Sequence, residues 1–147
     1  MINIYDDIRL TNVISKEYYF NYRDFEDVME DFLDIIGELN VKIKGFPFYS
    51  INKFPKKNEY VVMEFFISVT DSYVDVPEDM KFHSYFSIED MISITVFNDY
   101  EKNAKKAYKE LKKFAKKNKL KQITPFFNVI GGDDTFQYNI LKVGVIE

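Results

Sequence analysis

The sequence contains no cysteine, no tryptophan and only one histidine among its 147 residues. The lack of cysteine excludes disulfide bonds, thiolate metal sites and a thiol nucleophile. No apolar run approaches the ~18 residues that a membrane-spanning helix needs. The first seven residues have no basic region followed by an apolar run, so they do not form a secretory signal. We therefore expect a cytoplasmic protein with no membrane partner.

The residues that are abundant indicate a globular chain rich in aromatic rings. Hydrophobic residues make up 46% and charged residues 30%, as in folded soluble proteins, and the length suits one domain spanning residues 1–147. Fifteen phenylalanines and eleven tyrosines exceed what a small core normally needs. Two interpretations stay open: the codon bias of an AT-rich genome, or an aromatic-lined pocket.

The modest net charge of −4 hides two segments of opposite charge. Asp24–Leu39 holds seven acidic and no basic residues, whereas Asp99–Lys121 holds ten lysines against three acids. These segments are either two separately solvated faces or surfaces that attract a second copy or another protein. The lysines could bind phosphate, but arginine occurs only twice and the rest of the chain is acidic. We expect no direct nucleic-acid binding.

The most informative feature is an internal repeat. Asp24–Val69 and Asp99–Val145 each contain an amphipathic helix, a proline-aromatic turn and two strands. Earlier strands precede both helices, at Ile8–Phe20 and at Met91–Phe97. We interpret the chain as two pseudo-symmetric halves, 1–70 and 82–147, joined by a connector at 71–81.

This order predicts an α+β fold made of duplicated β-α-β-β modules. One mostly antiparallel sheet of about eight strands would carry two long helices on one face, with a cleft between the modules. Further strands are expected at Phe48–Phe54, Tyr60–Thr70, Phe82–Phe86 and Gln137–Ile146, with turns at Thr124-Pro125 and at Ile130–Asp134.

Aligning the last strands of the two halves predicts which side chains face the helices. Strand side chains alternate between two faces. The helix-facing set is Phe65, Ile67, Val69, Leu141, Val143 and Val145. The set on the opposite, open face is Glu64, Phe66, Ser68, Ile140, Lys142 and Gly144.

This arrangement resembles the gyrase-inhibitor-like (GyrI-like) effector-binding domain, which is built from two such modules. The resemblance rests on element order, on the proline-aromatic turns and on the strand Met63–Val69, where Glu64 and Val69 match an acid and a valine that the family often has. The chain departs from the family at Ser68, which replaces a proline, and at Ile140, which replaces the acid in the second half. At the entry to the second helix, Asn98-Asp99-Tyr100 keeps only the aromatic residue.

The resemblance implies non-catalytic binding of a small hydrophobic ligand, including hydrophobic cations, in the cleft between the modules. Glu64 would receive the cation, with aromatic neighbours at Phe66, Tyr60, Tyr49, Phe126 and Tyr138. The plainer interpretation is a solvated strand acid paired with Lys142. Two other functions stay open: a protein-interaction module, perhaps a homodimer, and a hydrolase of strained-ring compounds using Glu64 with Tyr60 or Tyr138.

Other candidate chemistry is weak. His83 has no recognisable nucleophile setting around it in the sequence, so an ordinary surface or packed histidine is favoured. Asp133-Asp134 follows two glycines, which is typical of a hairpin turn rather than of a metal site. We expect no catalytic residues, no metal and no cofactor.

Overall fold

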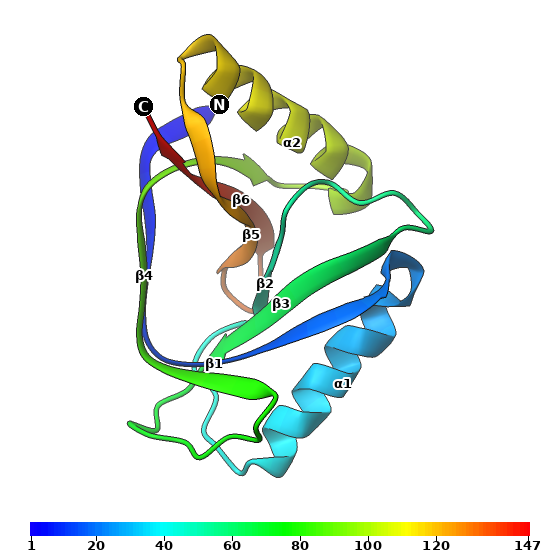
Figure 1. The fold of residues 1–147 in the computed structure, drawn as a ribbon, viewed down its shortest axis with the longest axis vertical. Helices are drawn as coiled ribbons and strands as arrows, with labels where there is room; N and C mark the ends of the chain where they lie inside the picture. The colour runs from blue at the N-terminus through cyan, green and yellow to red at the C-terminus, as the bar shows by residue number, and fades with distance from the viewer. The chain divides into compact units, whose positions relative to one another are not determined.

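The computed structural model describes all 147 residues and confirms the α+β class. Six strands, two α-helices and a short 3-10 helix follow one another along the chain (Figure 1). In chain order they are β1 (Ile2–Asn21), η1 (Tyr22–Asp24), α1 (Phe25–Glu38), β2 (Phe48–Ile51), β3 (Tyr60–Ser68), β4 (Met80–Val96), α2 (Tyr100–Lys117), β5 (Lys121–Gly132) and β6 (Gln137–Ile146).

The chain forms two compact units. The first unit comprises Met1–Ile8, Ser50–Phe54 and Ser87–Glu147, and the second unit comprises Arg9–Tyr49 and Pro55–Phe86. Each long strand is divided between them: β1 passes from the first unit to the second after Ile8, and β4 passes back after Phe86. The start of β1 therefore belongs to the first unit although the rest of β1 lies in the second. The start of β4 likewise belongs to the second unit although the rest of β4 lies in the first.

In the second unit, α1 covers one face of an antiparallel strand pair. Residues Val13–Asn21 of β1 pair with Tyr60–Ser68 of β3, and the helix lies along these strands in Figure 1. Phe32 and Ile36, one helical turn apart, are fully buried, and the Phe32 ring stacks on Phe65 at 5.9 Å. The acidic residues of α1 occupy its other face, as the amphipathic pattern predicted.

The first unit repeats this plan with α2 and the strands β4, β5 and β6. β6 pairs antiparallel with both β4 and β5. Ala104, Ala107, Tyr108 and Leu111 form the buried stripe of α2. The Tyr108 ring lies 4.8 Å from that of Phe126, which is 1% exposed. Since Phe126 pairs with Val143, that valine faces α2, as predicted.

The strand pairing in the two units follows the same register. In the second unit Ile14 pairs with Ile67 and Ser15 with Phe66. In the first unit Ile92 pairs with Val143 and Ser93 with Lys142. This is the register that the alignment of the last strands predicts, and it gives each residue of one module a counterpart in the other.

The two long strands also bend at matching positions. Asn12 and Asp90 both have φ = 56°, in the left-handed region that asparagine and aspartate tolerate better than most residues. Asn12 precedes Ser15 by the same number of residues as Asp90 precedes Ser93, so the two bends occupy equivalent positions of the repeat. Both bends follow shortly after the strand passes from one unit to the other, so the change of direction is built into the repeat.

The prediction of about eight strands is wrong, because six are present. Phe82–Phe86 and Met91–Phe97 were expected as separate strands, but both belong to β4, which runs through Ser87–Asp90 without a break. Polar residues at that point suggested a turn. The single left-handed residue Asp90 bends the strand there without ending it.

The expected turn at Thr124-Pro125 is also absent, since both residues lie inside β5. The pairing of β5 with β6 is irregular between Gln122 and Phe126, and this irregularity accommodates a proline, which has no N–H to donate. The hairpin turn predicted at Ile130–Asp134 begins later than expected. Asp133 forms it by accepting hydrogen bonds from the backbone N–H groups of Thr135 and Phe136.

Candidate functional site

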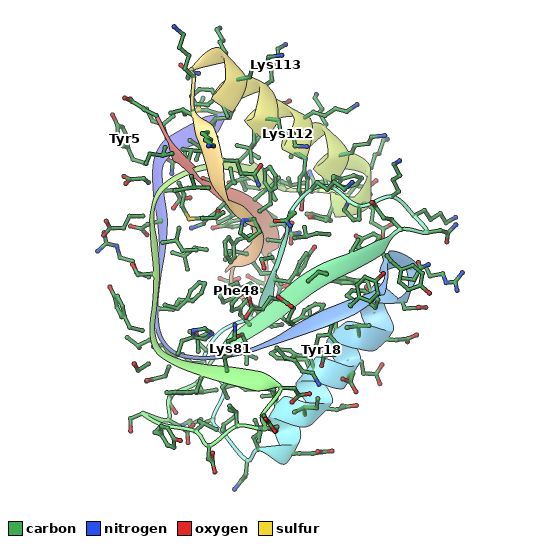
Figure 2. The ribbon with its side chains drawn as sticks, in the orientation of Figure 1. Tyr5, Tyr18, Phe48, Lys81, Lys112 and Lys113 are labelled. Atoms are coloured by element: carbon green, nitrogen blue, oxygen red, sulfur yellow. The ribbon has the colours of Figure 1, made fainter.

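Glu64 lies in the middle of β3, on the face of the second unit that points away from α1. Its neighbour Phe65 contacts Phe32 on the helix side, so the alternation of strand side chains places Glu64 and Phe66 on the other side. Figure 2 shows the two faces: Tyr18 lies beside α1, whereas Phe48 lies across the β1–β3 pair from it. We call this second face the Glu64 face.

A hydrogen-bond chain holds the Glu64 carboxylate. The Ser15 hydroxyl donates to Glu64 Oε2 at 2.7 Å, and the same hydroxyl oxygen lies 2.9 Å from His83 Nε2. Because the serine proton is used on Glu64, the histidine must donate its Nε2–H to Ser15. Ser15 is fully buried, whereas Glu64 and His83 are partly exposed. These hydrogen bonds therefore fix the position of one oxygen of the Glu64 carboxylate, on its buried side.

The charge state of His83 follows from its surroundings. Burial lowers the pKa of His83 below its usual 6.5, and the positive charge of Lys81 acts in the same direction, while the carboxylate of Glu64 partly opposes both. A histidine with a lowered pKa is neutral at pH 7. The site therefore keeps the negative charge of Glu64 without a histidine cation beside it.

Aromatic rings cluster around Phe66, which lies on the same strand face as this carboxylate. Phe48 stacks on Phe66 with ring centres 4.7 Å apart, and Phe86 lies 5.1 Å from Phe66 and 5.5 Å from His83. These rings bury Phe66 to 2% exposure, so the prediction of an open face is wrong at this end of β3. At this end the face is a packed cluster of aromatic side chains next to the strand position of Glu64.

The other end of the Glu64 face is exposed to solvent. Tyr60 and Val62 of β3 are 60% and 48% exposed, and the Tyr60 ring lies 5.6 Å from Tyr19 of β1. Glu17 pairs directly with Glu64 across the two strands. Two like charges in this position are unfavourable unless a cation or solvent separates them. The exposed end thus combines two tyrosines with excess negative charge.

Some of the predicted aromatic neighbours lie elsewhere in their units. Tyr49 contacts Phe25 and Phe65, at 5.1 and 5.9 Å, and so belongs to the α1 side of the second unit. Phe126 is packed against α2 in the first unit. Tyr138, also in the first unit, lies 5.6 Å from Phe97. Of the predicted set, Phe66 and Tyr60 share the Glu64 face.

The expected pairing of Glu64 with Lys142 is wrong. Lys142 forms an ion pair with Asp6 at 3.0 Å and donates a hydrogen bond to the backbone carbonyl of Asp7 at 2.7 Å, within the first unit. Burial acts to raise the pKa of Asp6, but hydrogen bonds from Ser93 and Lys142 outweigh it and hold that pKa below its usual value. Lys142 is thus committed to another carboxylate.

Sequence reasoning missed Ser15, Phe48 and Phe86, and treated His83 as incidental. Ser15 lies on a strand far from β3 in sequence, and its contact with Glu64 depends on the register of β1 against β3. Two signals were available: Ser15 directly follows the apolar Val13 and Ile14, and Ser93 stands at the matching position of the repeat. A buried serine normally has a hydrogen-bond partner, and that expectation would have directed attention to a facing acid.

The geometry does not suit Ser-His-acid catalysis. In such a triad the histidine stands between the serine and the acid, whereas here Ser15 stands between His83 and Glu64. The Ser15 hydroxyl is also fully buried and its proton is held by the carboxylate. No cluster of three or more His, Asp or Glu residues is arranged to hold a metal ion. The arrangement positions a carboxylate, which can bind a cation.

The first unit contains an unrelated cavity of about 540 Å³ near the end of α2. Ile4, Ile92, Phe114 and Val145 are among its lining residues, and Asp90 and Glu147 add carboxylates. Its volume lies within the range of small-molecule sites. Among its lining side chains, Asn118 donates a hydrogen bond to the backbone carbonyl of Phe114 at 2.9 Å.

Comparison with known proteins identifies the family. Residues 9–147 match the family described as "Domain of unknown function (DUF5085)", and the chain belongs to that family. None of the curated proteins matches this chain. Neither helix combines the length and apolar character that crossing a membrane requires.

Several solved structures share the fold at low sequence identity. The EcmrR C-terminal domain superposes with a TM-score of 0.71 at 10% identity, with 99% of each chain covered. EcmrR in a complex with DNA superposes with a TM-score of 0.70 at 11% identity. The superposition covers 98% of this chain and 58% of the EcmrR chain. A candidate bacterial transcription regulation protein from Staphylococcus aureus MU50 gives 0.50 at 14% identity, covering 97% of this chain and 98% of that one. The predicted resemblance therefore stands at the level of a shared fold.

Proposed function

We propose that the protein binds a small hydrophobic cation on the Glu64 face without transforming it chemically. The single observation that carries this proposal is a carboxylate fixed by a buried serine next to a packed cluster of aromatic rings. No lysine or arginine is paired with Glu64, so its charge is available to a ligand. Aromatic ring faces attract cations and also bury apolar groups.

The fold neighbours support a regulatory setting for such binding. One of them occurs in a complex with DNA and another is described as a candidate transcription regulator. We infer that this chain provides the ligand-sensing part of a comparable process. Contact with DNA by this chain itself is not part of the proposal, because the lysines of α2 are offset by the acidic remainder of the sequence.

Thermal unfolding with a matched pair of probes tests this function. The cation 4-phenylbutylammonium should raise the melting temperature, and neutral 4-phenylbutanol should raise it much less. At a ligand concentration about ten times Kd the stabilisation is about 1.4 kcal/mol. For a domain of this size that amounts to roughly 3–6 °C.

The Glu64→Gln variant should lose this shift, because glutamine can still accept the hydrogen bond from Ser15 but carries no charge. Glu26→Gln removes an exposed acid from α1 and serves as the matched control, which should respond like the wild type. Equal shifts in wild type and Glu64→Gln would show that the carboxylate is not the binding group.

A further inference from the structure

The first unit contains a second carboxylate held by a buried serine. Ser93 donates to Asp6 Oδ2 at 2.6 Å and is 2% exposed. By strand register Ser93 is the counterpart of Ser15, which holds Glu64 Oε2. Both modules therefore use the same strand position to fix one oxygen of a carboxylate.

In the first unit a primary ammonium group binds the other oxygen. Lys142 Nζ lies 3.0 Å from Asp6 Oδ1 and donates a further hydrogen bond to the carbonyl of Asp7. The side chain of Lys142 is only 12% exposed, so its alkyl part is enclosed by the unit. The serine, the carboxylate and the alkylammonium form one complete hydrogen-bonded group.

In the second unit the serine at this position holds a carboxylate from a different strand, β3 instead of β1, and no protein cation is paired with it. The residue opposite Ser15 is Phe66, at the position that Lys142 occupies opposite Ser93. The Ser15 hydroxyl donates its hydrogen bond to Glu64 Oε2, and no protein donor forms a hydrogen bond with Oε1. A ring thus replaces the lysine chain, and the second carboxylate oxygen is left for an external donor.

We propose that the ligand of Glu64 is a primary alkyl- or arylalkylammonium, whose N–H groups donate to Oε1 while its apolar part lies against the partly exposed ring of Phe86. This inference rests on the proposed function and specifies its ligand class. A charge-assisted N–H···O contact is shorter and stronger than the attraction of a carboxylate for a quaternary ammonium, which has no N–H to donate.

Calorimetric titration of the wild-type protein with two matched cations tests the inference. We expect 4-phenylbutylammonium to bind at least about tenfold more tightly than its N,N,N-trimethyl derivative, since one charged hydrogen bond is worth more than 1.4 kcal/mol. Ser15→Ala should reduce this ratio, because the carboxylate would no longer be fixed. Equal affinities, or tighter binding of the trimethyl compound, would overturn the inference while leaving the proposed function intact. If neither cation binds, the proposed function itself fails.

A second measurement uses the first unit and needs no binding at Glu64. Lys142→Ala removes the internal ammonium, and n-butylammonium should restore part of the lost melting temperature by taking its place beside Asp6. Tetramethylammonium at the same concentration should restore less. Equal restoration by the two salts would contradict the idea that a serine-held carboxylate in this fold selects an N–H donor.

Discussion

His83 is the only histidine, so its titration reports on the Glu64 face without ambiguity. NMR titration should give a pKa below 6.5, because burial and Lys81 outweigh the attraction of Glu64. In Glu64→Gln that attraction is lost, so the pKa should fall further. A pKa at or above 6.5 in the wild type would contradict the lowering by burial and by Lys81.

The same titration sets the pH dependence of binding and of stability. The charged groups on this face are Glu64, its neighbour Glu17 across the strand pair, and Lys81 beside His83. Protonation of His83 adds a positive charge near Glu64, so affinity for a cation should fall as the pH drops through the lowered pKa of His83. The unfolded chain binds the histidine proton more readily than the folded one, so this group lowers stability below about pH 6.5 and not above it.

At the scale of elements, the bends in β1 and β4 test the repeat. Asn12→Val and Asp90→Val should each destabilise the protein by about 1–2 kcal/mol, because a β-branched residue is strained at φ = 56°. Asn12→Gly and Asp90→Gly should cause no such loss, since glycine adopts this conformation without strain. Urea denaturation of the four variants measures the effect, and a cost at one bend but not at the other would argue against their equivalence.

The helices were predictable because their periodicity is local. Phe32 and Ile36 recur at helical spacing between acids, and α1 and α2 begin within about one residue of the starts expected at Asp24 and Asp99. The long strands were predicted only in part. Ile8–Phe20 was expected as a strand and lies within β1. The strands expected at Phe82–Phe86 and Met91–Phe97 are one strand, β4, because the left-handed residue Asp90 bends the strand without ending it.

The candidate site was predictable only in part, for a related reason. Glu64, Phe66 and Tyr60 lie on one strand, where alternation alone assigns them to the same face. Ser15 and His83 come from other strands, and their positions depend on register, which one sequence does not reveal. Tyr49 illustrates the limit: its alignment with a proline-aromatic turn gave no indication that its ring faces α1.

For the whole molecule, the two modules share a fold but differ in charge at the equivalent positions. Ile140 stands where the second unit has Glu64, and Lys142 stands where it has Phe66. The first unit neutralises its own carboxylate, whereas the second unit does not. We therefore expect one cation site per chain. The opposite charges of α1 and α2 suit an interaction with another protein or a second copy, and salt-sensitive self-association would reveal it.

A crystal structure of the protein with 4-phenylbutylammonium tests the central claim most directly. The account predicts one ligand per chain, with its nitrogen about 3 Å from Glu64 Oε1 and its phenyl ring against the partly exposed ring of Phe86. A ligand found instead in the cavity beside Ile92 and Phe114 of the first unit, with Glu64 uncontacted, would contradict it.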